Sequence, residues 1–220
     1  NTLSVNTSGS YNTAIGDSVL ASNISGIFNI GLGYNSLANN TVGTNNIAIG
    51  GSTLLSNTTG ANNLGIGISA LQNNTTGSSN LGIGINALFN NTTASYNTGI
   101  GVNALYAMTS GGGNLAVGYQ AGRYFATDSP LTTVNSSVFL GQQTRASANG
   151  NTNEIVIGYD ALGNGSNSVT LGNTSVTKTI LQGNVGIANT SPSYLLHVGS
   201  STVTTGTSVA QFENAGGTCT

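Results

Sequence analysis

Carboxylates are the side chains of this sequence best suited to catalysis, and Glu154 and Asp160 are the nearest pair. Enzymes that cleave glycosidic bonds use two carboxylates, one as the acid and the other as the base or nucleophile. These two residues stand 6 positions apart, which places them on different segments of a short repeat. Solvation at the surface explains both of them better than catalysis does. The sequence therefore predicts no enzymatic activity and no catalytic residue.

Metal and cofactor sites have equally little support. Calcium-binding β-rolls place an acidic ligand in every repeat, whereas Asp17, Asp128 and Asp160 are the only aspartates and are widely scattered. His197 is the only histidine, and without a second ligand nearby we expect it to be a packed residue. Cys219 is the only cysteine, so the chain has no internal disulfide. We expect no bound metal and no cofactor.

Two further motifs suggest binding functions that their own repetition argues against. Residues 65–70 match the Gly-x-Gly-x-x-Ala fingerprint of dinucleotide sites, and residues 82–87 match it again. That fingerprint works only where a strand leads into a helix. Threonines that could order water or ice recur as Thr58, Thr75, Thr92 and Thr109, beside Thr59, Thr76 and Thr93. Because consecutive strand residues face opposite ways, we expect these threonines to form turns rather than a flat array.

The segments 57–59 and 74–76 read Asn-Thr-Thr, which matches the N-glycosylation sequence. They are either acceptor sites or by-products of a turn rich in Asn and Thr. The sequence leaves both interpretations open.

Charge is scarce in the chain of 220 residues, which has three basic and five acidic side chains and a net charge of -2. Nucleic-acid binding requires many phosphate-neutralising basic groups, so it is excluded as a function. No apolar run approaches the roughly 18 residues that a membrane span needs. We expect a surface solvated by Asn, Ser and Thr, and no membrane insertion.

The elements that would position any site follow a strict 17-residue period. It is marked by the glycines Gly16, Gly33, Gly50, Gly67, Gly84, Gly101 and Gly118. Four positions before each glycine stands an asparagine, at Asn12, Asn29, Asn46, Asn63, Asn80, Asn97 or Asn114. A small residue and an aliphatic residue precede each glycine, so every unit reads Asn-x-small-aliphatic-Gly.

This period predicts an all-β protein, a parallel β-solenoid with 17-residue rungs. The alternation in residues 64–68 indicates a strand. A leucine stands four positions after each of the first six glycines and a polar turn comes next, whereas the seventh unit breaks at Gly122. Stacking in register would place each Asn over the next, about 4.8 Å along the axis, where the side chains can hydrogen-bond.

The same units predict a homo-oligomer. Three inward aliphatic side chains per rung form a thin core against the entropy of ordering a whole rung. Small residues at alternate strand positions would let another backbone approach, and a second chain is the simplest candidate.

The regularity of the repeat changes along the chain. We expect regular repeats over residues 1–121, an inserted loop over 122–136, a second irregular solenoid section over 137–177, and a neck or cap over 178–220 that includes a strand at 208–212. The loop has the densest cluster of charges and aromatic rings. Its residues Arg123, Tyr124, Phe125 and Asp128 are the candidate receptor contacts.

These units resemble the left-handed β-roll heads of trimeric autotransporter adhesins, and more closely the repeat shafts of phage tail fibres and tailspikes. Residues 167–173, 183–187 and 191–198 look like the segment before the self-cleaving intramolecular chaperone domain of such fibres, a domain this sequence lacks. The resemblance implies a homotrimer on a virion tail or a cell surface. The period is longer than the 14-residue period of the adhesin heads.

We therefore expect a structural extracellular fibre segment that mediates attachment to a cell surface, with further copies of itself and a surface glycan or protein receptor as partners. The alternative is a bacterial surface adhesin or a subunit of a self-assembling filament. A glycan-degrading tailspike is less favoured.

Overall fold

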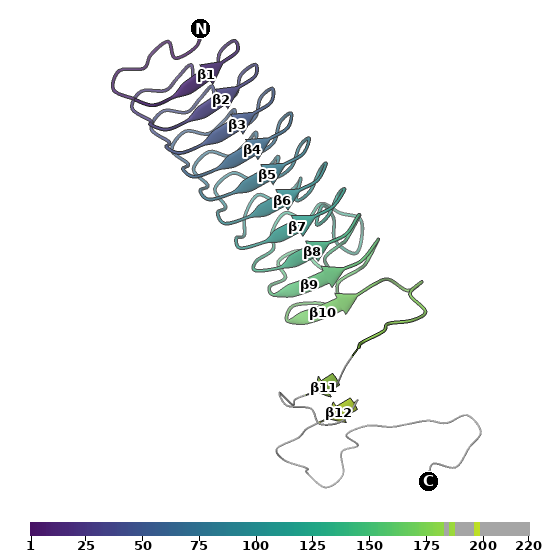
Figure 1. The fold of residues 1–220 in the computed structure, drawn as a ribbon. Helices are drawn as coiled ribbons and strands as arrows, with labels where there is room; N and C mark the ends of the chain where they lie inside the picture. Colours follow the sequence, from purple (N-terminus) through teal and green to yellow (C-terminus); the bar gives the residue numbers. More distant parts are fainter. Residues whose placement is uncertain (183–184, 188–195, 199–220) are drawn as a thin grey trace, which may run out of the picture. The chain divides into compact units, whose positions relative to one another are not determined.

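The computed structural model describes residues 1–182, 185–187 and 196–198, and it confirms the parallel β-solenoid. The chain divides into two units, Asn1–Ser175 and Val176–Thr220. In the first unit ten strands form one parallel sheet in chain order, stacked one below another in Figure 1. The strands are β1 (Thr13–Ile15), β2 (Ile30–Leu32), β3 (Ile47–Ile49), β4 (Leu64–Ile66), β5 (Leu81–Ile83), β6 (Thr98–Ile100), β7 (Leu115–Val117), β8 (Val138–Leu140), β9 (Glu154–Ile157) and β10 (Ser168–Leu171).

The rungs, each one turn of the solenoid, have the spacing that the sequence predicts. Partners in adjacent strands keep the 17-residue interval from β1 to β7, as in the pair Leu64 and Leu81. The interval widens between Leu115 and Val138, where β7 meets β8, and it narrows between Ile155 and Val169, where β9 meets β10. The six additional residues between β7 and β8 are the insertion in the chain.

The second unit contains a separate pair of parallel strands, β11 (Val185–Ile187) and β12 (Leu196–Val198), in which Gly186 is opposite His197. The side-chain packing of His197, residue Cys219 and the expected strand at 208–212 lie outside the described residues.

A glycine ends each strand of the regular rungs because the backbone there turns into a conformation that side chains rarely allow. The φ angle of Gly67 is +122°, and a Cβ atom on it would lie 2.7 Å from the carbonyl carbon of Gly84 on the next rung. Glycine therefore both permits the turn and lets successive rungs approach.

The interior of each rung is filled by a leucine row and not by the strand aliphatics. Leu20, Leu37, Leu54, Leu71, Leu88 and Leu105 are fully buried, whereas the first and third strand residues are half-buried or exposed. The central strand residue faces inward, where a Cβ atom on Gly82 or Gly99 would lie 3.2 or 3.1 Å from a leucine Cγ. The prediction of three inward aliphatic side chains per rung was therefore wrong. The small central residues of the strands make room for the chain's own leucines.

The leucines reach the interior from a tight turn. The φ angles of Leu54 and Leu71 are +51° and +53°, in the left-handed region that costs an L-residue about 1–2 kcal/mol. Full burial of each side chain offsets this strain by roughly 1.5–3 kcal/mol.

The insertion is accompanied by an exchange of large and small residues inside the solenoid. Gly122 takes the place of the leucine in its rung, and Phe139 takes the place of the small central residue in β8. A Cβ atom on Gly122 would lie 3.0 Å from Phe139 Cδ2 and 2.8 Å from Leu105 Cδ2. The fully buried phenylalanine therefore fills the space that the missing leucine leaves.

The predicted asparagine stack is present. Asn46 donates its backbone N–H and its side-chain N–H to Asn29 Oδ1, at 3.0 and 3.2 Å, and it also donates to the carbonyl oxygen of Gly60 at 2.8 Å. From Asn29 to Asn114 these side chains are at most 2% exposed. The ladder continues through other residue types, since Ser137 N–H donates to Asn114 Oδ1 and Glu154 N–H donates to Ser137 Oγ.

A second ladder, buried from Asn23 onward, runs beside the first and was not predicted from the sequence. It consists of Asn6, Asn23, Asn40, Asn57, Asn74 and Asn91, each amide from Asn23 onward donating to the Oδ1 atom of its predecessor. Met108 occupies the next position, so Asn91 Oδ1 is buried with no hydrogen-bond partner among the described residues. The second ladder therefore ends at Asn91, two rungs before the insertion.

The threonine row forms turns, as predicted. Thr41, Thr58, Thr75 and Thr92 each donate the side-chain hydroxyl to the backbone carbonyl of the next threonine, at 3.0–3.1 Å. These hydroxyl protons hold adjacent rungs together.

We expect Asn57→Ala to lower the free energy of unfolding by about 3 kcal/mol. The substitution removes three buried hydrogen bonds, two donated by Asn57 and one accepted from Asn74, each with a net contribution of about 0.5–1.5 kcal/mol. Urea denaturation followed by circular dichroism measures the change. Asn39→Ala is the matched control, because Asn39 is exposed. Equal midpoints for the two variants would show that the ladder contributes nothing to stability.

Candidate functional site

The insertion between β7 and β8 forms a compact turn on the side of the solenoid. Tyr124 pairs with Pro130 in an antiparallel bridge, and the Phe125 N–H donates to the carbonyl of Ser129 at 3.0 Å. Leu131 N–H donates to the Arg123 carbonyl at 3.0 Å, and the Leu131 side chain is fully buried. The chain thus leaves the rung after Arg123 and returns to it at Leu131.

A column of stacked side chains leads along the surface to this turn. The rings of Phe89 and Tyr106, on adjacent rungs, stack with centroids 5.1 Å apart. The Arg123 guanidinium carbon lies 4.9 Å from the centroid of Tyr106 and 4.9 Å from that of Tyr124. Arg123 is therefore sandwiched between two aromatic rings, an arrangement stabilised by cation–π attraction.

Beyond this column, Arg145 joins the insertion to the next two rungs. Its Nη1 atom lies 2.7 Å from Asp128 Oδ1, and its Nη2 atom lies 2.9 Å from Asp160 Oδ1. The Arg145 side chain is 23% exposed, whereas the carboxylates are 74% and 47% exposed. One partly buried cation thus fixes two accessible carboxylates.

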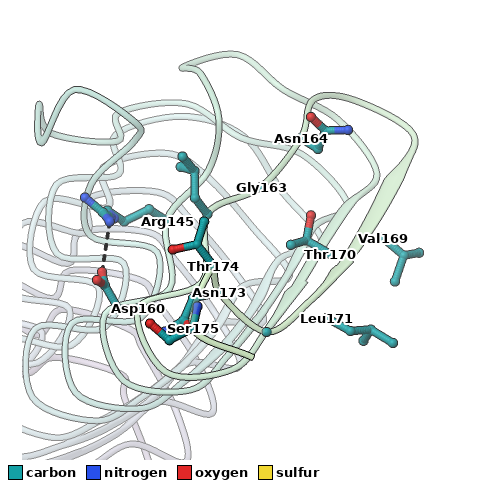
Figure 2. Close-up of a pocket in the computed structure, with 12 residues that line it drawn as sticks. Arg145, Asp160, Gly163, Asn164, Val169, Thr170, Leu171, Asn173, Thr174 and Ser175 are labelled. Atoms are coloured by element: carbon teal, nitrogen blue, oxygen red, sulfur yellow. Dashed lines mark hydrogen bonds and ion pairs between the residues drawn. The ribbon is translucent and has the colours of Figure 1, made fainter. Parts of the chain in front are cut away.

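Two cavities share Arg145 and Asp160 of this ion-paired group. One of about 460 Å³ is lined by Tyr124, Asp128, Gln143, Arg145 and Asp160. The other, of about 720 Å³, lies on the last turn of the solenoid and includes residues of β10 in its lining. Figure 2 shows Arg145 reaching toward Asp160 in this second cavity, with Val169 and Leu171 pointing away from the interior of the rung.

The predicted receptor contacts are only partly brought together. Tyr124 and Asp128 line the smaller cavity, and Arg123 lies against Tyr124. Phe125 packs against the hydrophobic core and pairs with Ala146 in a bridge, so its ring belongs to the scaffold.

Three residues of this cavity were not among the predicted receptor contacts, namely Gln143, Arg145 and Asp160, and Asp160 was considered only as a partner of Glu154 or as a metal ligand. The period itself contains the signal for two of them, because Arg145 follows Asp128, and Asp160 follows Gln143, at the same interval that separates the regular rungs.

Glu154 lies inside the solenoid, contrary to the expected surface position. Its side chain is fully buried and accepts hydrogen bonds from Ser147 N–H at 3.2 Å, Gly165 N–H at 2.9 Å and Asn151 Nδ2 at 2.9 Å. A Cβ atom on Gly163 would overlap its carboxylate, so that glycine makes room for it. Glu154 and Asp160 therefore do not form a pair of carboxylates facing a common substrate.

The two sequons fall in the second asparagine ladder. Asn57 and Asn74 are fully buried, and their amides are hydrogen-bonded within the ladder. A glycan on either amide would break these hydrogen bonds, so the burial of both residues favours their interpretation as turn residues.

In the part of the chain that the structure describes, no three His, Cys, Asp or Glu side chains gather as a metal site. Those same residues include no helix that could cross a membrane.

A second surface, which we call the outer face, is the solvent side of the sheet. It consists of the first and third residues of strands β1 to β8, the residues 155, 157, 169 and 171 of β9 and β10, and the apolar residues that follow the strands, Tyr34, Ile68, Ile85, Val102, Tyr119 and Tyr159. The residues of the outer face are almost entirely aliphatic or aromatic and none of them is charged, although Asp17 and Gln142 occupy the corresponding positions after β1 and β8. Ile68 is 58% exposed and Ile85 is 46% exposed.

Comparison of the chain with protein-family models, curated proteins and solved structures found no match.

We expect substitutions of Glu154 to destabilise the last rungs in a graded way. Glu154→Ala leaves three donors unpaired, and each buried unpaired group costs about 1–3 kcal/mol. Glu154→Gln retains an oxygen for the two backbone N–H groups and loses only the bond from Asn151, so it should be intermediate.

Hydrogen exchange of the backbone amides of β8 to β10 measures this effect, with Asp17→Asn as the exposed control. The amides of β1 to β6 should keep their protection in all variants, because repeat proteins open locally. Unchanged protection of β9 in Glu154→Ala would contradict the structural role of this carboxylate.

Proposed function

We propose that the chain is a segment of an extracellular fibre shaft, in which three copies pack through their outer faces and present a binding site on the side of the rod. The proposal includes the left-handed β-roll and the tail-fibre or adhesin setting that the sequence resemblance implies. Its function is to provide reach, stiffness and multivalent attachment to a cell surface.

The outer face is the observation that carries this proposal. Parallel sheets occur almost only where both faces are covered, and here the interior of the solenoid covers one face alone. Large exposed apolar patches on soluble proteins mark interaction sites. Further copies of the same rod are the occupant we propose, because a second rod offers an uncharged apolar surface of the same length and period.

Stiffness follows from the bonding between rungs. Between residues 40 and 91 two buried ladders and the threonine row connect each rung to the next, so bending the rod there would strain several hydrogen bonds at once. A stiff rod holds its lateral sites at fixed distances. Three copies would present each site three times, which raises avidity without any new contact.

A self-assembling filament is the second candidate, and one feature favours it. β1 and β10 are the edge strands of the ten-stranded sheet, and open edges are templates for pairing with another chain. End-to-end pairing through these strands would yield filaments, whereas packing through the outer face yields bundles of defined number.

The first test is the solution mass of the protein by light scattering, combined with electron microscopy of the same sample. We expect a mass of three chains and short rods. Long filaments would favour the second candidate, and a monodisperse single chain would overturn both proposals.

A variant on the outer face tests which surface is used. The double substitution Ile68→Asn with Ile85→Asn should shift the solution mass toward that of one chain. It replaces exposed apolar side chains, whose burial would stabilise the association, by polar ones. Thr76→Asn with Thr93→Asn is the matched control, since both threonines are exposed on turns of the neighbouring rungs. An unchanged mass for the isoleucine pair, with folding intact by circular dichroism, would exclude the outer face as the interface.

A further inference from the structure

We propose that the cavity of about 460 Å³ beside the insertion binds an uncharged saccharide unit of a surface glycan. Its volume lies in the range of about 300–1,000 Å³ that is usual for ligand sites. This inference rests on the proposed attachment function, to which it adds the class of ligand and the residues that contact it.

Tyr124 supplies the flat apolar surface that a sugar ring requires. Arg123 lies over one face of the Tyr124 ring, so the ring meets the cavity with its other face or its edge. The C–H groups on one side of a pyranose are apolar and slightly positive, and they match the negative face of an aromatic ring. The column from Phe89 through Arg123 holds Tyr124 in place from behind.

Asp128 and Asp160 supply fixed hydrogen-bond acceptors. Each uses its Oδ1 atom to bind Arg145, and neither Oδ2 atom accepts a hydrogen bond from a described residue. Gln143 adds an amide whose side chain likewise makes no hydrogen bond among the described residues. Sugar hydroxyl groups are donors that can replace water at such acceptors, and carboxylates held by a cation keep their geometry as the ligand enters.

The balance of charge favours a neutral ligand over a charged one. Arg145 and its two carboxylates sum to one negative charge, which Arg123 on the far side of Tyr124 offsets. A cation would be repelled by Arg123 across the same ring. An anion would find both terminal nitrogens of Arg145 already bonded to carboxylates. An uncharged polyhydroxylated ligand meets neither obstacle.

The site is small and open, so a single saccharide should bind weakly, with a Kd in the region of about 1 mM. Three copies on one rod would raise the effective affinity by a factor of about 10²–10⁴. Binding is therefore best measured on a surface with many immobilised copies of the saccharide.

The test uses fluorescent rods of the whole chain on an array of immobilised oligosaccharides. Neutral members end in a hexose, a 6-deoxyhexose or an N-acetylhexosamine, and acidic members end in sialic or uronic acid. We expect the rods to bind neutral spots. Tyr124→Ala should reduce the signal at least tenfold, and Asp160→Asn should also weaken it, because an amide N–H replaces an acceptor.

Tyr96→Ala is the control, since Tyr96 is 71% exposed and lies outside the cavity. Its signal should equal that of the unsubstituted chain. Binding confined to acidic spots, or no neutral spot above background, overturns the inference. Equal loss in Tyr124→Ala and Tyr96→Ala would also overturn it.

Cell binding separates this inference from the proposed function. Rods that bind cells equally well before and after enzymatic removal of surface glycans would have a protein receptor, so the attachment function would stand and the glycan site would fall. Rods of defined mass that bind neither cells nor glycans would contradict both.

Discussion

Axial stacking of buried asparagine amides is the interaction on which the rest of this structure depends. Asn46 and Asn57 belong to different ladders, yet both donate to the carbonyl oxygen of Gly60, so the two ladders bond the same turn from two directions. A rung out of register would leave these buried groups unpaired, at about 1–3 kcal/mol each. The length of the repeat is thus enforced by hydrogen bonds, and the positions of the glycines and leucines follow from it.

A narrow interior is the second constraint, and it reverses the usual distribution of apolar residues. The leucine row occupies the space behind the strands, so the central strand residue is glycine or alanine in the regular rungs while the larger aliphatics face outward. Phe139 is consistent with this limited space, because this large side chain lies inside the solenoid only where Gly122 has replaced a leucine. The apolar outer face, and with it the tendency to associate, is a consequence of how little fits inside.

The candidate site lies where the regular repeat is interrupted. The second ladder ends at Met108, the insertion follows Arg123, and Glu154 replaces asparagine in the first ladder. In the regular rungs the buried asparagine side chains are used in stacking, and no charged cluster interrupts the ladders. Irregular rungs free Tyr124, Asp128 and Gln143 to line a cavity, while Arg145 and Glu154 restore the polar bonds that the ladders no longer supply.

The sequence by itself determined the fold class, the rung length and the asparagine stack, because a strict period leaves few other ways to pair the strands. It also located Tyr124 and Asp128 as surface candidates through their local density of charge and aromatic rings. Only the tertiary structure decided which strand residues face inward, since alternation is the same for either face and the leucines enter from turns with positive φ. It likewise buried Glu154 and brought Arg145 between two aspartates, because these positions depend on which rungs lie above and below them.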